Sequence, residues 1–358
     1  MNLIFFNTAA LGDYLVHSRL IKDFKLKYNC HITAVCSPYN SRIIKFHDHI
    51  DQIILYDKKW NFFKKLQILK TILKKKYYLS IVFDCRKFSM IVNFLLNAKY
   101  KRGLLMRKYK KIFSYKFFLY YPSKIIAFFL YDKYVVHKRV KYIDKPYYLP
   151  ATWINLLSDF NLNTSVDNIY YFNNKKICEK EKILILKKLS IKNYILFHID
   201  HKWKDIKDIN STFYSNLLKL NLITKKNILI TSYNNESGYF KSLEKKINSF
   251  DTKTYNLSKK NNKNIFLVKD PSIFLQERLI SNSDLNVSCH SGILVHGSGA
   301  NKIELIDILN SSEISIQKCW TPRKNYSVIL KSTKNSDKID LKCIFSQISQ
   351  KILKLNFI

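Results

Sequence analysis

The chain has 358 residues, a formal net charge of +36 and a hydrophobic content of 47%. That length favours two domains, each with a core of its own, and the hydrophobic content excludes a disordered chain. The seven cysteines are scattered and form no CxxC pair, which argues against a disulfide framework and favours a reducing cytoplasm. We find neither a signal-peptide pattern nor a run of about 18 apolar residues, so no membrane-spanning segment is expected.

Positive charge and aromatic side chains occur together in residues 101–150. This stretch has thirteen Lys or Arg against two Asp, with fourteen aromatic residues interleaved. Such a composition suits the anionic surface of a membrane, and it also suits nucleic acid. A solvated basic face over an aromatic core explains it equally well without any partner, so the three interpretations stand side by side.

Short apolar runs alternate with stretches of helical spacing along the chain. In the first half we predict strands at 2–6, 31–36, 52–57 and 79–85, and helices at 14–28 and 60–76. In the second half we predict strands at 193–199, 227–233, 284–289 and 303–308, helices at 211–224 and 236–249, and an amphipathic helix at 339–357. A polar, irregular stretch near 165–180 separates the halves. The pattern predicts two doubly wound α/β domains that bind ligands at the carboxyl ends of their strands, facing an interdomain cleft.

Three of the six glycines, at 292, 297 and 299, follow the predicted strand 284–289. A strand, a tight turn with Ser291 and Gly292, and a helix start would present backbone N–H groups and a helix dipole to a phosphate. Gly297 and Gly299 would permit tight packing or a break near the helix end. An ordinary turn that binds nothing is the alternative interpretation.

Two further loops follow predicted strands in the same way. Gly12 and Asp13 open the first helix, where Asp13 could also be a plain N-terminal helix residue. Lys202, Lys204 and Lys207 come after the strand at 193–199 and could neutralise a diphosphate.

The loop that carries these lysines ends at a helix whose N-cap we place at Asn210 or Ser211. His198 and His201 have a spacing known from metal ligands, but no Cys or carboxylate set completes a site. We interpret both as loop residues and expect no bound metal.

Several segments together resemble glycosyltransferase family 9, the heptosyltransferase-like enzymes of lipopolysaccharide assembly. Residues 11–28 look like the opening Gly-Asp-x-Leu helix of that family, and residues 77–104 are similar to its strand ending in Asp, its helix and a turn that ends here at Gly103. Lys207, six residues before Phe213, matches a Lys pattern of the family, although the usual Trp-Pro is absent. Residues 283–308 stand where the family has a strand followed by Asn-Asp-Ser/Thr-Gly.

The resemblance implies a GT-B fold: two Rossmann-like doubly wound domains, an acceptor-binding domain at 1–172 and a nucleotide-sugar-binding domain at 173–358, with the last helix packing back on the first. It implies inverting, metal-independent transfer of a sugar, heptose by family default, from a nucleotide-diphosphate donor, ADP-linked donors among them, to a lipopolysaccharide-type or other surface glycan. No cofactor is implied. The enzyme would be cytoplasmic and peripheral at the inner face of the cytoplasmic membrane.

The resemblance also implies roles for single residues. Asp13, beside Gly12, would be the general base toward the acceptor hydroxyl. Lys207 and the backbone at Ser291 and Gly292 would stabilise the leaving diphosphate.

Two donor-binding positions are less settled. Glu236 would contact ribose or base, with a helix cap as its alternative role. His290 stands where the family has an Asp that contacts the donor sugar, and a histidine cannot reproduce the acceptor pattern of a carboxylate, so the sugar stays open.

Two other functions compete with transfer. The altered donor loop would also fit a catalytically inactive GT-B-like protein that serves as a binding partner or scaffold in glycan assembly. Nucleic-acid binding rests on charge alone, because no recognisable nucleic-acid module is present, and we do not expect nucleic acid as a partner.

Overall fold

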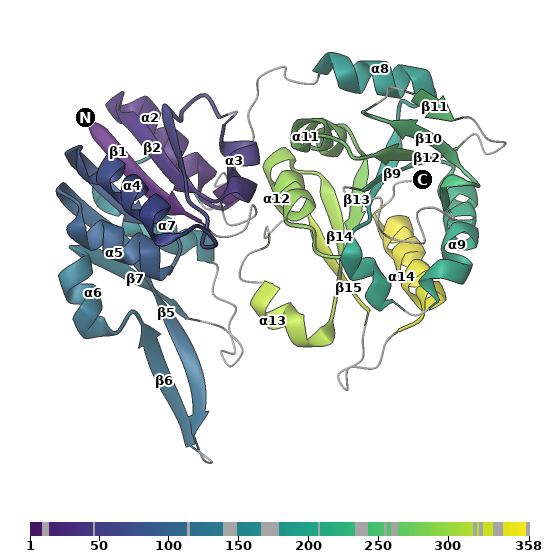
Figure 1. Cartoon of the computed structure of the whole chain (residues 1–358). Coiled ribbons are helices and arrows are strands. Elements are labelled where there is room, and N and C mark those ends of the chain that lie inside the picture. Colours follow the sequence, from purple (N-terminus) through teal and green to yellow (C-terminus); the bar gives the residue numbers. More distant parts are fainter. Residues whose placement is uncertain are drawn as a thin grey trace. The chain divides into compact units, whose positions relative to one another are not determined.

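The alternation of strands and helices builds two mainly parallel sheets, one in each half of the chain (Figure 1). In the computed structural model, unit 1 comprises Met1–Asn173 and Ser315–Trp320, and unit 2 comprises Asn174–Ile314 and Thr321–Ile358. The structure describes all residues except 9–13, 46, 113–114, 139–148, 166–178, 207, 233–242, 254–255, 259–263, 318–320, 322–324, 332–338 and 356–358.

The sheet of unit 1 has the strand order β3-β2-β1-β4-β5-β6, and β7 pairs with β5. The strands are β1 Asn2–Asn7, β2 His31–Cys36, β3 Gln52–Leu55, β4 Tyr77–Val82, β5 Ala98–Ile112, β6 Tyr115–Tyr121 and β7 Lys133–Lys138. All pairs are parallel except β5 with β6, which form an antiparallel hairpin. Because β2 and β4 flank β1, the order reverses beside β1, which is where doubly wound sheets bind ligands.

Three of the helices of unit 1 begin at residues whose side chains cap them. They are α2 Ser18–Tyr28, α3 Pro38–Ile44, α4 Phe62–Leu73, α5 Lys87–Leu95, α6 Lys124–Leu130 and α7 Leu149–Leu156. Ser37, Asn61 and Ser123 each accept a backbone N–H from three residues ahead, at α3, α4 and α6 respectively. Apolar residues of α4, α5 and α6 pack with residues of β1, β2, β4 and β5 in one core, so these three helices cover the same face of the sheet.

The sheet of unit 2 has the order β11-β10-β12-β9-β8-β13-β14-β15. Its strands are β8 Tyr194–His198, β9 Asn227–Ser232, β10 Asn248–Asp251, β11 Asn256–Ser258, β12 Ile265–Lys269, β13 Leu285–Ser288, β14 Glu304–Leu309 and β15 Tyr326–Leu330. Its helices are α8 Glu179–Leu189, α9 Ile209–Thr224, α11 Ile273–Ser281, α12 Gly292–Asn301 and α14 Leu341–Lys354. The short α13, Ile314–Gln317, begins at the last residue of the first segment of unit 2 and continues in residues that belong to unit 1. The order reverses between β8 and β13, so the ligand position of this unit lies where those strands end.

The α/β class and the doubly wound arrangement are confirmed, but several local predictions are wrong. Residues 236–242 of the predicted helix 236–249 lie outside the described residues, and the prediction is wrong at its end, because Asn248 begins the buried strand β10, which extends the sheet beside β12. Helix α9 starts at Ile209 with Asp208 as its N-cap, two residues earlier than predicted. Gly103 lies inside β5 and not in a turn, since the ring of Tyr131 packs where a Cβ would stand.

The apolar face of the last helix packs inside unit 2. This face of α14 belongs to the core of unit 2 and consists of Leu341, Ile344, Phe345, Ile348 and Ile352. The ring of Phe345 stacks on Phe197 of β8 with the ring centroids 5.9 Å apart. That this helix also packs back on the first domain stays a prediction.

The glycines after β13 are helical. Gly292 is the first residue of α12, and Gly297 and Gly299 lie inside it, so the predicted break near the helix end is absent from this described segment. Among the described residues no glycine has a positive φ, and the left-handed position of this turn is taken by His290 with φ 53°.

Candidate functional site

The turn from β13 to α12 carries the three predicted donor residues that the structure describes: His290, Ser291 and Gly292. Ser291 is the N-cap of α12, and within the described residues its side chain makes no capping hydrogen bond. The first intrahelical bond runs from Val295 N–H to Ser291 O at 2.9 Å, so the N–H groups before Val295 have no acceptor inside the helix. These N–H groups and the helix dipole can bind an anion.

A buried carboxylate fixes the shape of this turn. Asp307 of β14 has no solvent exposure, and it accepts the backbone N–H of His290 at 2.7 Å and the ring Nδ1 of His290 at 2.6 Å. Tyr326 of β15 donates its hydroxyl to the same carboxylate at 2.8 Å. An ionised carboxylate only accepts, so Nδ1 of His290 carries a proton and Nε2 is the nitrogen left for a ligand. The contacts offset the cost of a left-handed residue that is not glycine.

Lys202 places a positive charge at the same turn. Its Nζ donates to the carbonyl oxygen of His290 at 2.5 Å. Lys202 belongs to a 3-10 helix, His201–Asp205, that follows β8. Buried Lys331 supports this helix by donating to the carbonyl oxygen of Lys202 at 2.9 Å. The turn therefore combines a helix N-terminus, an ammonium group and an imidazole, which is a chemistry suited to a diphosphate.

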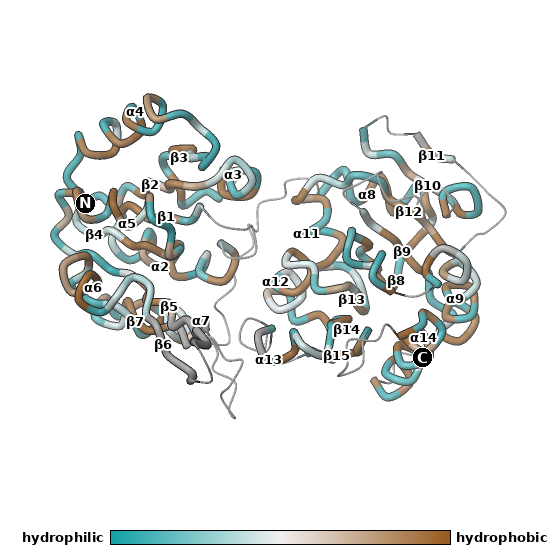
Figure 2. Tube along the Cα trace, turned by 60° about the horizontal axis from the view of Figure 1, so that its bottom comes forward, coloured by the Kyte–Doolittle hydropathy of each residue, from teal (hydrophilic) through white to brown (hydrophobic). Residues whose placement is uncertain are grey.

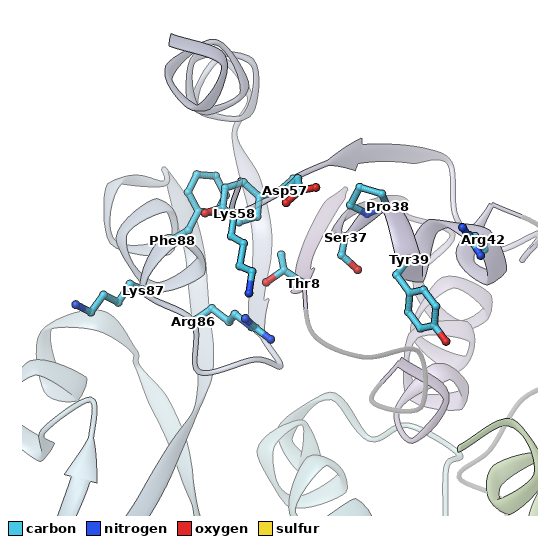
Figure 3. A pocket seen from close by; sticks show the side chains of 11 residues that line it. Thr8, Ser37, Pro38, Tyr39, Arg42, Asp57, Lys58, Arg86, Lys87 and Phe88 are labelled. Carbon is cyan, nitrogen blue, oxygen red and sulfur yellow. The ribbon is translucent and has the colours of Figure 1, made fainter. Parts of the chain in front are cut away.

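Unit 1 has a cavity of about 600 Å³ at the carboxyl ends of its parallel strands. Its walls come from the segments after β1, β2, β3 and β4. The lining residues are Thr8, Ser37, Pro38, Tyr39, Arg42, Tyr56, Asp57, Lys58, Arg86, Lys87 and Phe88 (Figure 3).

Cations outnumber acids on the wall of this cavity. The lining has four basic residues and one acidic residue: Arg42, Lys58, Arg86 and Lys87 against Asp57. In Figure 3 the side chains of Lys58 and Arg86 extend toward the middle of the cavity, while Lys87 points away from it. The cavity therefore suits an anionic ligand.

Aromatic side chains complete the wall. Tyr56 stacks on Phe88 with ring centroids 3.7 Å apart, and Tyr39 lines the cavity on another side. Aromatic faces beside cations are typical of sites that bind charged sugars and other partly apolar anions.

Hydrogen bonds hold the end of β1 just before residues 9–13. Thr8 donates its backbone N–H at 2.5 Å and its hydroxyl at 2.6 Å to the buried Asp84, which follows β4. Burial raises the pKa of Asp84, and the Thr8 hydrogen bonds oppose that shift. Asn7 pairs with Nε2 of His17 at 2.9 Å, and burial lowers the pKa of that histidine well below its usual value, so His17 is a neutral acceptor.

Four predicted site residues lie outside the described residues: Gly12, Asp13, Lys207 and Glu236. Sequence reasoning missed Asp307 and Tyr326, which lie on the next two strands after the predicted turn. The parallel register pairs Ser288 with Asp307, so an acid at the end of the next predicted strand was the available signal. The basic residues of the cavity also follow predicted strands. The chain has 62 Lys and Arg, so nothing in the sequence singles these residues out.

The interpretation of His198 as a loop residue is wrong. It is the last residue of β8 and is buried, with Nδ1 3.1 Å from the hydroxyl of Thr231, while its carbonyl accepts the indole N–H of Trp203. His201 opens the following 3-10 helix. In the part of the chain that the structure describes, no group of three His, Cys, Asp or Glu side chains could hold a metal.

No protein-family model and no curated protein matches this sequence. Solved structures do match its fold. A family 9 glycosyl transferase from Veillonella parvula matches with a TM-score of 0.71 at 11% identity, over 99% of this chain and 97% of that one. The heptosyltransferase WaaC of E. coli, solved with ADP, matches with a TM-score of 0.64 at 12% identity over 99% of both chains.

The same fold also occurs in enzymes of another class. A UDP-GlcNAc 2-epimerase from Methanocaldococcus jannaschii matches with a TM-score of 0.53 at 13% identity over 99% of both chains. The transferase structures are the more similar ones. Over nearly its whole length, this chain therefore has the GT-B fold of the family 9 glycosyltransferases and heptosyltransferases.

Proposed function

We propose that the protein is an inverting, metal-independent glycosyltransferase that moves a sugar from a nucleotide-diphosphate donor to an anionic surface-glycan acceptor. Unit 2 binds the donor and unit 1 binds the acceptor. The observation that carries the proposal is the turn from β13 to α12, where uncapped helix N–H groups meet Lys202 and a histidine held by Asp307. The reaction takes place in the cytoplasm, at the inner face of the cytoplasmic membrane.

The donor diphosphate binds at the N-terminus of α12. The helix N–H groups and Lys202 neutralise charge on the leaving diphosphate, and Lys207 adds to them. His290 donates or accepts through Nε2, while its other ring nitrogen stays on Asp307. ADP is the first nucleotide to test, because a similar structure was solved with it, and ADP-heptose is the first sugar donor. Glu236 contacts the nucleoside.

The acceptor binds in the cavity of unit 1. Arg42, Lys58 and Arg86 favour an acceptor with carboxylate or phosphate groups, such as an acidic sugar of a lipopolysaccharide-type glycan. The Tyr56 and Phe88 rings offer an apolar surface to the sugar ring.

Transfer is a single displacement. Asp13, five residues after Thr8 in the sequence, removes the proton from the acceptor hydroxyl. The hydroxyl oxygen forms a bond to the anomeric carbon as the bond from that carbon to the diphosphate oxygen breaks. The nucleotide diphosphate leaves with the electron pair, and the anomeric configuration inverts.

Nucleotide binding is the first test. Full-length protein should be melted with ADP, UDP and GDP, each at about 100 times its dissociation constant. One bound nucleotide then adds about 2.7 kcal/mol, which raises the Tm of a unit of this size by roughly 5–10 °C. A protein whose Tm responds to none of the three would refute the proposal.

Asp13→Ala separates a transferase from an inactive scaffold, the alternative that the replacement of the family Asp by His290 suggests. A transferase should keep its nucleotide affinity within about twofold and lose turnover by roughly 10²- to 10⁴-fold. Turnover is followed by mass spectrometry of the acceptor incubated with ADP-heptose. If wild type binds ADP but neither transfers nor hydrolyses any donor, the scaffold function is correct.

A further inference from the structure

Two neighbouring helices of unit 1 expose an apolar face. We call it the α5–α6 face, and it consists of Ile91, Phe94 and Leu95 of α5 with Ile125, Ile126, Phe128 and Phe129 of α6. These seven side chains are between 49% and 75% exposed. A hydrogen bond from Asn93 Nδ2 to Leu130 O at 3.0 Å joins the two helices, and Figure 2 shows hydrophobic residues along both.

The exposure is not a sign that the helices are poorly packed. Met90 and Val92 of α5 and Ala127 and Leu130 of α6 are buried in the core of unit 1. Each helix is therefore apolar on its inner and its outer side. A cluster of this size on the outside of a protein marks an interaction surface.

The segment that contains this face carries positive charges and no negative charge. Residues 85–131 have eleven Lys or Arg and no Asp or Glu. Lys124, at the start of α6, is exposed and lies 4.9 Å from the ring of Tyr120. Protein–protein interfaces are depleted in lysine around their aromatic residues, whereas an anionic lipid surface attracts lysine and takes up aromatic side chains. The composition therefore favours a lipid surface as the occupant.

A hairpin from the same segment extends beyond the sheet. Strands β5 and β6 pair from Met106–Tyr121 to Ile112–Tyr115, whereas β7 accompanies β5 only as far as Arg107. The rest of the hairpin projects as a two-stranded ribbon (Figure 1), and its sequence, KYKKI and YKFFL, is again basic and aromatic. The ribbon leads directly into α6, so it belongs to the same segment of the chain as the α5–α6 face.

We propose that unit 1 docks on the surface of an anionic lipid bilayer through the α5–α6 face and the lysines around it. The apolar side chains enter the boundary between headgroups and acyl chains, and the lysines contact anionic headgroups. Helix α5 begins at Lys87 in the wall of the acceptor cavity, and its nine residues span about 13 Å. Docking thus holds the cavity within about one helix length of the membrane, where the head of a lipid-linked acceptor lies.

Co-sedimentation of the full-length chain with vesicles tests the docking. Wild type should bind vesicles of phosphatidylcholine with 30% phosphatidylglycerol far better than vesicles of phosphatidylcholine alone (roughly tenfold or more for several lysines at the surface). Added salt should weaken this preference. The assay needs no sugar donor, so its failure would leave the transferase proposal standing.

A matched pair of variants locates the surface. Phe128→Ser with Phe129→Ser should lower vesicle binding by roughly tenfold or more, because two large apolar side chains no longer leave water. Leu222→Ser with Ile223→Ser changes two exposed neighbours on α9 of unit 2 and should leave binding within about twofold. All variants replace exposed side chains, and circular dichroism verifies that they fold.

Two results would overturn the docking. The first is that the wild-type protein does not bind the anionic vesicles, or binds them no better than the variant with Ser at positions 128 and 129. The second is a wild-type dimer in sedimentation that the same variant converts to a monomer, with no vesicle binding by either protein. That result would show that the α5–α6 face binds a second copy of the chain.

Discussion

Replacing Asp307 with Asn tests whether the carboxylate of β14 holds the donor turn in its working shape. The carboxylate accepts three hydrogen bonds, two from His290 and one from Tyr326. An Asn of the same shape has one accepting oxygen, and its other end is an NH₂ donor. One of the two N–H groups of His290 then faces the NH₂ group of the Asn, which cannot accept a hydrogen bond. Otherwise, Nδ1 must accept a hydrogen bond from that NH₂ group, which restricts the imidazole to the neutral form with its proton on Nε2.

The size of the effect follows from the contacts that Asp307→Asn removes. A hydrogen bond to a charged group contributes about 1.5–3 kcal/mol, and the left-handed backbone of His290 costs about 1–2 kcal/mol unless the turn is held. If one such bond is lost, nucleotide-diphosphate binding should weaken roughly 10- to 150-fold, and relaxation of the turn would add to that loss. Tyr326→Phe leaves both hydrogen bonds from His290 to the carboxylate in place, so its loss of affinity should be smaller than that of Asp307→Asn.

Calorimetric titration of ADP into each variant measures this loss directly. Asp84→Asn is the matched control, because Asp84 is also a buried acid beyond the end of a parallel strand, but in unit 1. That control should lower the Tm and leave ADP affinity within about twofold. A folded Asp307→Asn protein that binds ADP as tightly as wild type would refute the assigned role of the carboxylate.

Three further predictions concern stability. Gly103→Ala should cost about 1–3 kcal/mol in urea unfolding, because the added Cβ would overlap the ring of Tyr131; the cost should vanish when the change is made in a Tyr131→Ala background. Glu277→Gln should raise the Tm at pH 8 and leave it unchanged at pH 4. Burial raises the pKa of Glu277 to about 8, so this residue destabilises the folded state only as the pH rises above the pKa of the unfolded state, near 4.5. An equal effect on the Tm at both pH values would contradict this assignment. Burial lowers the pKa of His198 to about 4. Between pH 6.5 and 4 the unfolded state therefore binds a proton at this residue that the folded state does not. As the pH is lowered through this range, the free energy of unfolding should fall by up to about 1.4 kcal/mol per pH unit because of this group. His198→Gln should flatten that slope, and an unchanged slope would show that His198 is not neutral in the folded protein.

The strands of the two sheets could be predicted because their signal is local. Runs such as 2–6 and 284–289 are apolar and short, and each is followed by a turn and a helical stretch. The helix predicted at 236–249 failed at its end because a buried strand and a buried helix turn look alike over four residues. The β5–β6 hairpin was missed because lysines and aromatic residues occupy neighbouring positions, which hides the period of two.

The donor site shows where local reasoning ends. Ser291 and Gly292 could be placed at a helix start from the strand that precedes them. The left-handed backbone of His290 could not be predicted, since it depends on a carboxylate 17 residues away that becomes a neighbour only through the pairing of β13 with β14. For Gly297 and Gly299 the sequence left tight packing or a break near the helix end open, and both are ordinary helix residues of α12.

Hydrogen–deuterium exchange with and without ADP tests the central claim most directly. The account predicts that ADP slows exchange in peptides that cover the start of α12, residues 289–295, and the 3-10 helix after β8, residues 199–206, while peptides around the unit 1 cavity, residues 84–88, are unchanged. Slowed exchange confined to unit 1, or no slowing at the start of α12 under saturating ADP, would contradict the placement of the donor diphosphate.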